Sequence, residues 1–277
     1  MPIEYISIII AVFPTIYFLF FFHSKDKSKK NPINKIFPIF FLGMFSMIPV
    51  LLIETVIGSI NDEYFSNIFI TSFITSFIIA GCCEEGAKFI IIRKFVYDNA
   101  HFNSIMDGII YTIAASLGFA CIENISYTLS MGSDVGYMRA FTAVPLHVCA
   151  SGIMGYYIGK AKIQNNSKMS RFYLKKGFIR AVMIHGTYNF FLFLSIEDSQ
   201  YSYLNILIFP ILIISFIFLY NMVKECSKDD SKNIILEPNA SAIGINTLPL
   251  ERARQKPNKK NTSNSVKEGY QKGDLYN

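Results

Sequence analysis

Long apolar segments run through most of this chain, and they restrict what it can fold into. The hydrocarbon core of a bilayer is about 30 Å thick, so a helix that crosses it needs about 20 consecutive, mostly apolar residues. About seven segments meet that length. They fall at Ile3 to Phe22, Ile36 to Ile57, Asn67 to Ile92, Met106 to Leu129, Tyr137 to Gly159, Gly177 to Ser195 and Tyr203 to Val223. With 52% hydrophobic and 17% charged residues in a length of 277, the chain is predicted to be an all-α, polytopic transmembrane helical bundle.

The two ends of the chain are expected to differ. The first apolar segment has no basic residue before it and no small-residue cleavage site after it, so we expect it to stay as a helix and not to be removed as a signal peptide. Residues 224–277 change to Lys, Asn, Ser, Asp and Glu without a sustained helical or strand period. This composition predicts a disordered cytoplasmic tail.

The connections between the apolar segments differ in charge, which predicts how the chain is oriented. Lys and Arg follow the first, third, fifth and last segments, whereas none occurs in Gly58 to Ser66, Ser130 to Gly136 or Ile196 to Ser202. By the positive-inside rule, the N-terminus is expected outside and the C-terminus in the cytoplasm. The net charge of +6 then reflects topology and attraction to anionic lipid. No folded basic domain remains to bind nucleic acid.

Three acidic side chains need an explanation because they lie inside the predicted spans: Glu84, Glu85 and Glu123. A carboxylate at the centre of a membrane helix costs about 2.5 to 3.5 kcal/mol, and such residues usually mark functional sites. Counted by helical rise, all three lie in the same central layer of the membrane as His147 and His185. These five residues come from four consecutive spans, so the sequence predicts that they converge.

Helical spacing indicates which side chains can act together, since residues i and i+4 share a face. Glu84 shares a face with Lys88, and His185 with Asn189. Glu85 is rotated by about 100° from Glu84. One glutamate of the pair is therefore expected to face the cleft while the other braces a neighbouring helix or a cation.

These residue types are suited to hydrolysis. A carboxylate in a poorly solvated pocket can take a proton from water, and an opposing His or Asn can donate to the oxyanion that develops on a peptide carbonyl. No GxSxG, SxxK or HExxH motif is present, so a covalent mechanism is less attractive. Two His and one Glu would complete an open zinc site, and the candidate ligands are Glu85, Glu123, His147 and His185. The sequence leaves the metal-dependent and metal-free mechanisms open.

Structural explanations also exist for each of these residues. Glu84 and Lys88 could form a buried salt bridge, Glu123 could bridge helices, and Arg139 and Arg180 are expected to be structural counter-ions.

A chain of acids and histidines could also belong to an ion or metal transporter or channel. A non-enzymatic immunity or scaffold protein is a further alternative. Gly155 and Gly159, four residues apart, predict close helix packing.

Four sequence motifs in order resemble the PrsW family of intramembrane proteases, within the superfamily of CAAX-type prenyl proteases and bacteriocin-processing proteins. The motifs are EEGAK at 84–88, DGIIYTIAASLGFACIENISY at 107–127, RAFTAVPLHVCASGIMGYYIGKAK at 139–162 and HGTYNF at 185–190. This resemblance covers about half of the chain. It divides the chain into N-terminal spans (1–65), a protease-like core (66–195), a final span (196–223) and the tail (224–277).

The resemblance implies a membrane peptidase, of the glutamate type or a metalloprotease, with specific residues in its site. Glu84, Glu85 and His185 would be catalytic, and Lys88, Glu123, His147 and Asn189 would support them. The family's task implies a membrane-anchored protein as substrate, an anti-sigma factor being the known case. We therefore expect an integral protein of the bacterial cytoplasmic membrane, with the lipid bilayer as its surroundings.

Overall fold

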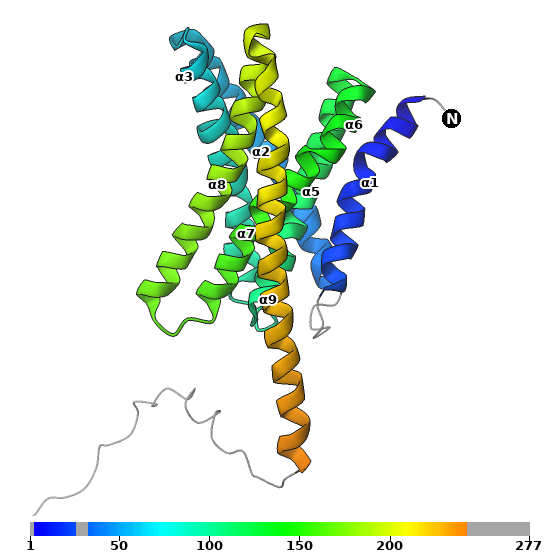
Figure 1. The fold of residues 1–277 in the computed structure, drawn as a ribbon, viewed down its shortest axis with the longest axis vertical. Coiled ribbons are helices and arrows are strands. Elements are labelled where there is room, and N and C mark those ends of the chain that lie inside the picture. Colours follow the sequence, from blue (N-terminus) through cyan, green and yellow to red (C-terminus); the bar gives the residue numbers. More distant parts are fainter. Residues whose placement is uncertain (1–2, 26–32, 243–277) are drawn as a thin grey trace, which may run out of the picture. The chain divides into compact units, whose positions relative to one another are not determined.

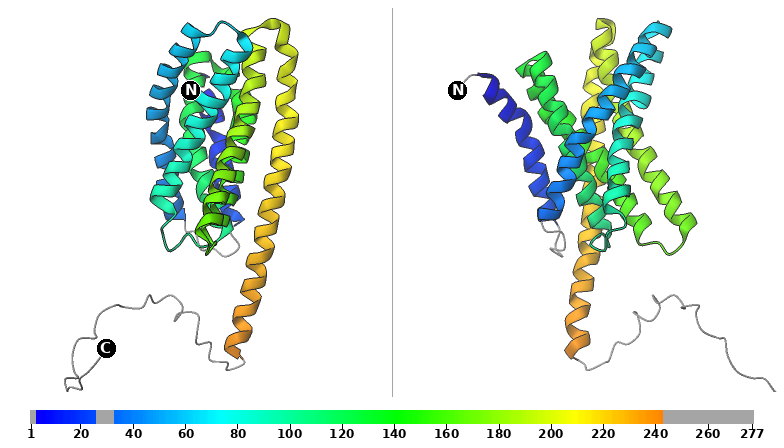
Figure 2. Two further views of the ribbon diagram at one scale, coloured as in Figure 1. Left: turned by 90° about the vertical axis from the view of Figure 1, so that its left-hand side faces the viewer. Right: turned by 180° about the vertical axis from the view of Figure 1, so that it is seen from behind.

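The structure is a computed structural model that describes residues 3–25 and 33–242, and within these ranges every regular element is a helix. The elements, with π-helical and 3₁₀ segments labelled η, are α1 (Ile3–Ser24), α2 (Ile33–Tyr64), α3 (Ile68–Phe73), η1 (Ile74–Glu84), α4 (Glu85–Ile91), η2 (Ile92–Val96), α5 (Ile105–Met131), α6 (Ser133–Phe141), α7 (Ala143–Lys162), α8 (Ser167–Glu197), η3 (Ser199–Leu207) and α9 (Ile208–Ala242). Figures 1 and 2 show how these helices pack side by side. The predicted all-α class is confirmed.

The described residues form 7 helical segments long and apolar enough to cross a membrane. They are Ile6–Ser24, Ile33–Asn61, Ile68–Val96, Ile105–Met131, Ser133–Lys162, Ser167–Glu197 and Ser199–Ser227. Each overlaps one predicted span, and most extend several residues beyond it. The polytopic transmembrane prediction is therefore confirmed.

The third span is not a uniform α-helix. It starts at α3, where the Asn67 side chain accepts hydrogen bonds from the backbone N–H groups of Phe69 and Ile70. It then continues as the π-helix η1 before returning to α-helix at Glu85. A π-helix has more residues per turn than an α-helix and is usually found at functional sites. The hydrophobic pattern alone could not show this change of winding.

The fifth span was predicted as one helix from Tyr137 to Gly159, but it is two helices that meet at Thr142. Thr142 has φ −120° and ψ −58°, which ends α6 and precedes α7. Pro145 follows three residues later. Proline has no N–H to donate and its ring clashes with the carbonyl four residues before it, so a continuous helix is disfavoured through this point.

The centre of the bundle is formed by α5 and α7. The most apolar windows of the two spans that contain them are 89% buried, against 22–39% in the other five spans. Glycines allow the two backbones to approach: a Cβ atom on Gly155 would lie 2.4 Å from the carbonyl oxygen of Gly108, and one on Gly159 would lie 2.6 Å from the Cα of Ile105. The predicted packing role of Gly155 and Gly159 is confirmed.

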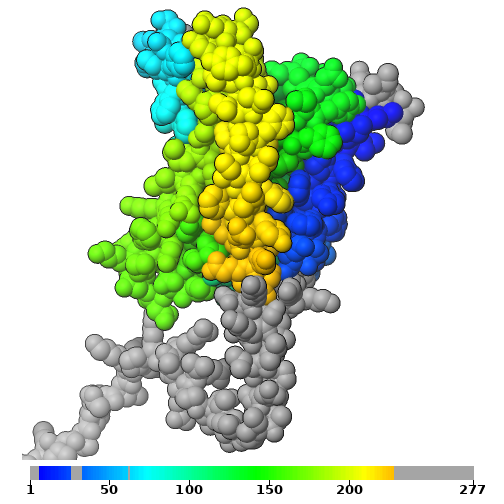
Figure 3. Space-filling model, in the orientation of Figure 1, coloured from blue at the N-terminus to red at the C-terminus, as the bar shows by residue number. Residues whose placement is uncertain are grey.

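The last span, α9, lies on the outside of the bundle, with most of its side chains uncovered (Figure 3). The helix does not end at Val223 but continues to Ala242, and the boundary of the disordered tail at residue 224 stays a prediction. The extension has a local cause, because no Gly or Pro occurs between residues 224 and 237 and Glu225 accepts a hydrogen bond from Tyr156 at 3.1 Å. Residues 235–277 group as a separate unit. The rest of the predicted tail, 243–277, lies outside the described residues.

The Gly155 contact makes a testable prediction about stability. The substitution Gly155→Ala should lower the free energy of unfolding by about 1–3 kcal/mol, because the added methyl group overlaps backbone that cannot move alone. Gly58→Ala is the matched control, since a Cβ on Gly58 meets nothing within 4 Å. Thermal unfolding of the purified chain in detergent, followed by circular dichroism, compares the two variants. Equal melting temperatures for the two variants would contradict the close approach of α5 and α7.

Candidate active site

Six ionisable side chains from four spans form one buried cluster. Glu84 ends η1, Glu85 and Lys88 lie in α4, and the other three come from α5, α7 and α8: Glu123, His147 and His185. Each has a relative exposure of 9% or less, and Glu85 and Lys88 are completely buried. The structure thus brings together the acids and histidines that were expected to converge.

Lys88 occupies the middle of this cluster. Its ammonium donates to Glu85 Oε1 at 2.8 Å, to Glu84 Oε2 at 3.3 Å and to His147 Nδ1 at 2.9 Å. It also lies 4.6 Å from the centre of the Phe119 ring. Lysine has three protons to donate and no acceptor. Lys88 therefore pairs with both glutamates of the EEGAK motif at once, although its single charge balances only one of them.

The two histidines are held in a similar way. Glu85 Oε1 lies 3.0 Å from His185 Nδ1, and Glu123 Oε2 lies 2.8 Å from His147 Nε2. Lys88 can only donate, so His147 Nδ1 accepts a hydrogen bond from it. The proton of the ring is therefore on Nε2, which donates to Glu123. A carboxylate therefore fixes one nitrogen of each imidazole.

The histidine nitrogens that bond no carboxylate both lie near Glu84, although that of His147 already accepts a hydrogen bond from Lys88. His185 Nε2 lies 3.8 Å from Glu84 Oε2, and His147 Nδ1 lies 4.0 Å from the same oxygen. One donor atom from each of Glu84, His147 and His185 lies within 4.8 Å of the others. A zinc site with an open position uses three ligands of these types. The predicted ligand set contained Glu85 and Glu123 and not Glu84, and which carboxylate would bind a metal stays a prediction.

The two glutamates of the motif have different surroundings. Glu85 accepts three hydrogen bonds, from Lys88, from His185 and from Ser151 at 2.7 Å. Among the described residues, Glu84 accepts one, from Lys88. Glu84 thus keeps acceptor capacity for a further group, whereas Glu85 ties α4 to α7 and α8.

Local structure in α5 and α7 positions Glu123 and His147. α5 begins with a capping box in which Asp107 N–H donates to Ser104 Oγ at 3.1 Å and Ser104 N–H donates to Asp107 Oδ2 at 2.8 Å. Within the bundle, Ser116 Oγ donates to the backbone carbonyl of His147 at 3.0 Å. These contacts set where α5 starts and how it lies against α7.

Arg139 is the counter-ion of Glu123, as expected. Its Nη2 lies 2.7 Å from Glu123 Oε1, and its guanidinium lies 3.8 Å from the centre of the Tyr127 ring. Arg180 was expected in the same role, but within the described chain it donates to the Tyr157 hydroxyl and pairs with no acid. Its charge stays near the end of the bundle, away from the acids.

Asn189 lies one helical turn beyond His185 on α8 and is buried. No hydrogen bond within the described part of the chain joins its amide to the cluster. Its place beside His185 agrees with the predicted spacing, and its part in the site stays a prediction.

Glu54 was missed in the sequence reasoning, although it is an acid inside the predicted second span. It lies on the face of α2 that carries Met47 and Val50, which pack with Phe119. Its half-buried carboxylate interacts electrostatically with Glu123 and Lys88. The sequence signal was available, since an acidic residue among apolar ones in a membrane span is itself unusual.

The cluster has more negative than positive formal charge. Four carboxylates, Glu54, Glu84, Glu85 and Glu123, face the two cations Lys88 and Arg139. The difference of two negative charges matches the charge of one divalent cation. Two protonated histidines would balance it equally well.

Comparison with known proteins gives one consistent result. Residues 31–219 match the sequence model of the family described as "PrsW family intramembrane metalloprotease". A protein called Protease PrsW from Clostridioides difficile is 33% identical over 190 residues, which is 66% of this chain and 78% of that protein. The Bacillus subtilis protein of the same name is 33% identical over 182 residues, 66% of this chain and 80% of that protein. The one from Oceanobacillus iheyensis is 31% identical over 219 residues, 79% of this chain and 95% of that protein. No solved structure matches the chain significantly.

The Glu123–Arg139 pair can be tested by a double-mutant cycle. Arg139→Met should lower the free energy of unfolding by about 3–5 kcal/mol, because it leaves a buried carboxylate without its counter-ion. Adding Glu123→Gln should recover part of that loss, since the uncompensated charge is then removed. Arg180→Met is the control, because Arg180 pairs with no acid in the described chain. A double variant less stable than Arg139→Met alone, measured by thermal unfolding in detergent, would contradict the pairing.

Proposed function

This chain belongs to the PrsW family of intramembrane metalloproteases, and we propose that the cluster around Glu84 hydrolyses a peptide bond of a membrane-anchored protein. One observation carries the assignment to this cluster. Each of two histidines has one nitrogen fixed by a carboxylate and the other within 4.0 Å of Glu84, where the His147 nitrogen accepts from Lys88. Carboxylate–histidine pairs of this kind orient the ligands of metal sites and raise their basicity.

We propose that Glu84, His147 and His185 hold a divalent metal ion, for which zinc is the candidate. The donor set fits zinc. A metal ion held there would polarise the scissile carbonyl and lower the pKa of its bound water. Glu85 and Glu123 are assigned to holding the two imidazoles.

The chain's own residues have distinct roles in this proposal. Glu85 fixes His185 and Glu123 fixes His147, while Lys88 and Arg139 compensate their charge. Glu84 has two carboxylate oxygens, and the one that would not hold the metal ion can take up the proton of the attacking water. Asn189, one turn from His185, is assigned to donate to the oxyanion that forms on the peptide carbonyl.

The proposed setting is the bacterial cytoplasmic membrane, with the N-terminus outside and the C-terminus in the cytoplasm. The support is the distribution of Lys and Arg, which the positive-inside rule interprets. A buried site among α4, α5, α7 and α8 suits a substrate that is itself anchored in the bilayer. An anti-sigma factor is the candidate that the family resemblance supplies.

The catalytic assignment predicts the effect of single substitutions. Glu84→Gln, Glu85→Gln and His185→Ala should each abolish cleavage, because each removes a group that faces the reacting atoms or fixes one that does. Glu63→Gln is the control, since Glu63 is exposed in the connection after the second span. Expressing each variant in a bacterial host and quantifying membrane proteins by mass spectrometry identifies a single-span protein that the active chain removes. Continued removal of that protein by all three site variants would contradict the assignment.

Zinc binding by the purified protein tests the proposed metal site separately from cleavage. The purified chain should bind about one zinc ion, and Glu123→Gln should weaken zinc binding by about 10- to 100-fold because it frees the His147 ring. Zinc content after dialysis against defined zinc concentrations, measured by plasma mass spectrometry, gives both values, with Glu63→Gln again as control. Cleavage that persists in a chelator with metal-free protein would assign the chemistry to the glutamates alone.

A further inference from the structure

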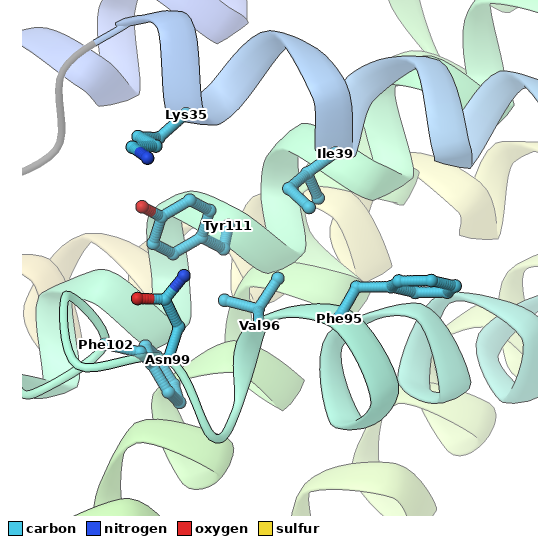
Figure 4. Close-up of a pocket in the computed structure, with 7 residues that line it drawn as sticks. All are labelled: Lys35, Ile39, Phe95, Val96, Asn99, Phe102 and Tyr111. Atoms are coloured by element: carbon cyan, nitrogen blue, oxygen red, sulfur yellow. The ribbon is translucent and has the colours of Figure 1, made fainter.

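A small cavity lies near the start of α2. It is also lined by η2, by the loop that follows η2 and by α5. It is a cavity of about 40 Å³, shown in Figure 4. Its lining residues are Lys35, Ile39, Phe95, Val96, Asn99, Phe102 and Tyr111. The cavity therefore has room for a small polar group but not for a whole peptide or lipid.

The lining is polar at one end and apolar at the other. In Figure 4 the Lys35 ammonium, the Tyr111 hydroxyl and the Asn99 amide lie at one end, and Ile39, Val96 and Phe95 lie at the other. The Phe95 side chain is 51% exposed on the outside of the helix bundle. A ligand of this site would thus combine a small polar group that accepts hydrogen bonds with an apolar portion that continues along the bundle surface.

The charges around the cavity favour an anion. Lys35 is exposed, and no acid pairs with it in the described chain. The Lys94 ammonium lies 5.6 Å from the centre of the Phe95 ring, and the Lys162 ammonium lies 6.0 Å from that of Phe102. The cavity is therefore flanked by cations from α2, η2 and α7.

The cavity lies near the first residues of α2 and α5. Tyr111 lies six residues after the start of α5 at Ile105, which corresponds to about 9 Å along the helix. The polar layer on each side of the hydrocarbon core is roughly 5–8 Å thick. Lys35 lies two residues after the start of α2 at Ile33, so both polar residues lie near the first residues of their helices.

We propose that this cavity binds the phosphate of an anionic phospholipid, whose acyl chains pass along Ile39 and Phe95 into the bilayer. Basic pockets between membrane helices on the cytoplasmic side recognise anionic headgroups in this way. The site is separate from the catalytic cluster, because Tyr111 and Glu123 are about 18 Å apart along α5. Bound lipid would join the start of α2 to the loop that leads into α5.

Lipid retention by the full-length chain tests this proposal. The purified protein is incubated in detergent with equal amounts of phosphatidylglycerol and phosphatidylcholine, and bound lipid is counted by native mass spectrometry. We expect the wild type to retain one phosphatidylglycerol that Lys35→Ala binds about fivefold more weakly, the effect of one lysine near an anionic surface. Lys35→Arg should retain it, because the charge is kept.

A matched control and two further arms make the result decisive. Lys176→Ala removes a lysine that lies near the rings of Tyr157 and Phe172, away from this cavity, and should retain the lipid as the wild type does. Equal retention by Lys35→Ala and the wild type would overturn the proposal. Displacement of the lipid by an excess of inorganic phosphate would assign the cavity to free phosphate. Equal retention of phosphatidylcholine would show that charge does not select the ligand.

Discussion

The rest of this structure depends on how charge is neutralised inside the bilayer. An isolated carboxylate there is costly, and the cost falls when it is paired. Lys88 pairs with Glu84 and Glu85 within its own span and reaches His147 on α7, while Arg139 pairs with Glu123. These contacts can form only if the third to sixth spans lie together, so the chemistry of the site and the packing of the bundle impose the same arrangement.

Helix packing provides the precision that the site needs. Gly155 and Gly159 bring the backbone of α7 against α5, and Ser116 bonds the His147 carbonyl. Close contact of two rigid backbones fixes the distance between Glu123 and His147. The third span positions the two glutamates of the motif. Its π-helical segment ends at Glu84, and the α-helix that begins at Glu85 places Lys88 near both glutamates. Functional sites are a common place for such changes in winding.

Much of this arrangement could be predicted from the sequence, because it follows from hydrophobic length and from the depth of charged residues. The spans, the convergence of Glu84, Glu85, Glu123, His147 and His185, and the packing glycines are of this kind. The π-helical winding of the third span could not be predicted, since its apolar residues suit either winding. The choice of Glu84 as the carboxylate shared by both histidines depends on side-chain rotamers, which spacing does not determine. Glu54 could have been found, because its signal was the same as that of the other acids.

The central claim is the proposal that two histidines, each fixed by a carboxylate, hold a metal ion together with Glu84, His147 through the nitrogen that accepts from Lys88. An X-ray absorption spectrum of the zinc-loaded, full-length chain tests this most directly, because it reports the type and distance of the ligand atoms. The predicted spectrum contains nitrogen and oxygen ligands at about 2.0–2.2 Å with the scattering pattern of two imidazoles. A sulfur ligand at about 2.3 Å, or fewer than two imidazoles, would contradict the account.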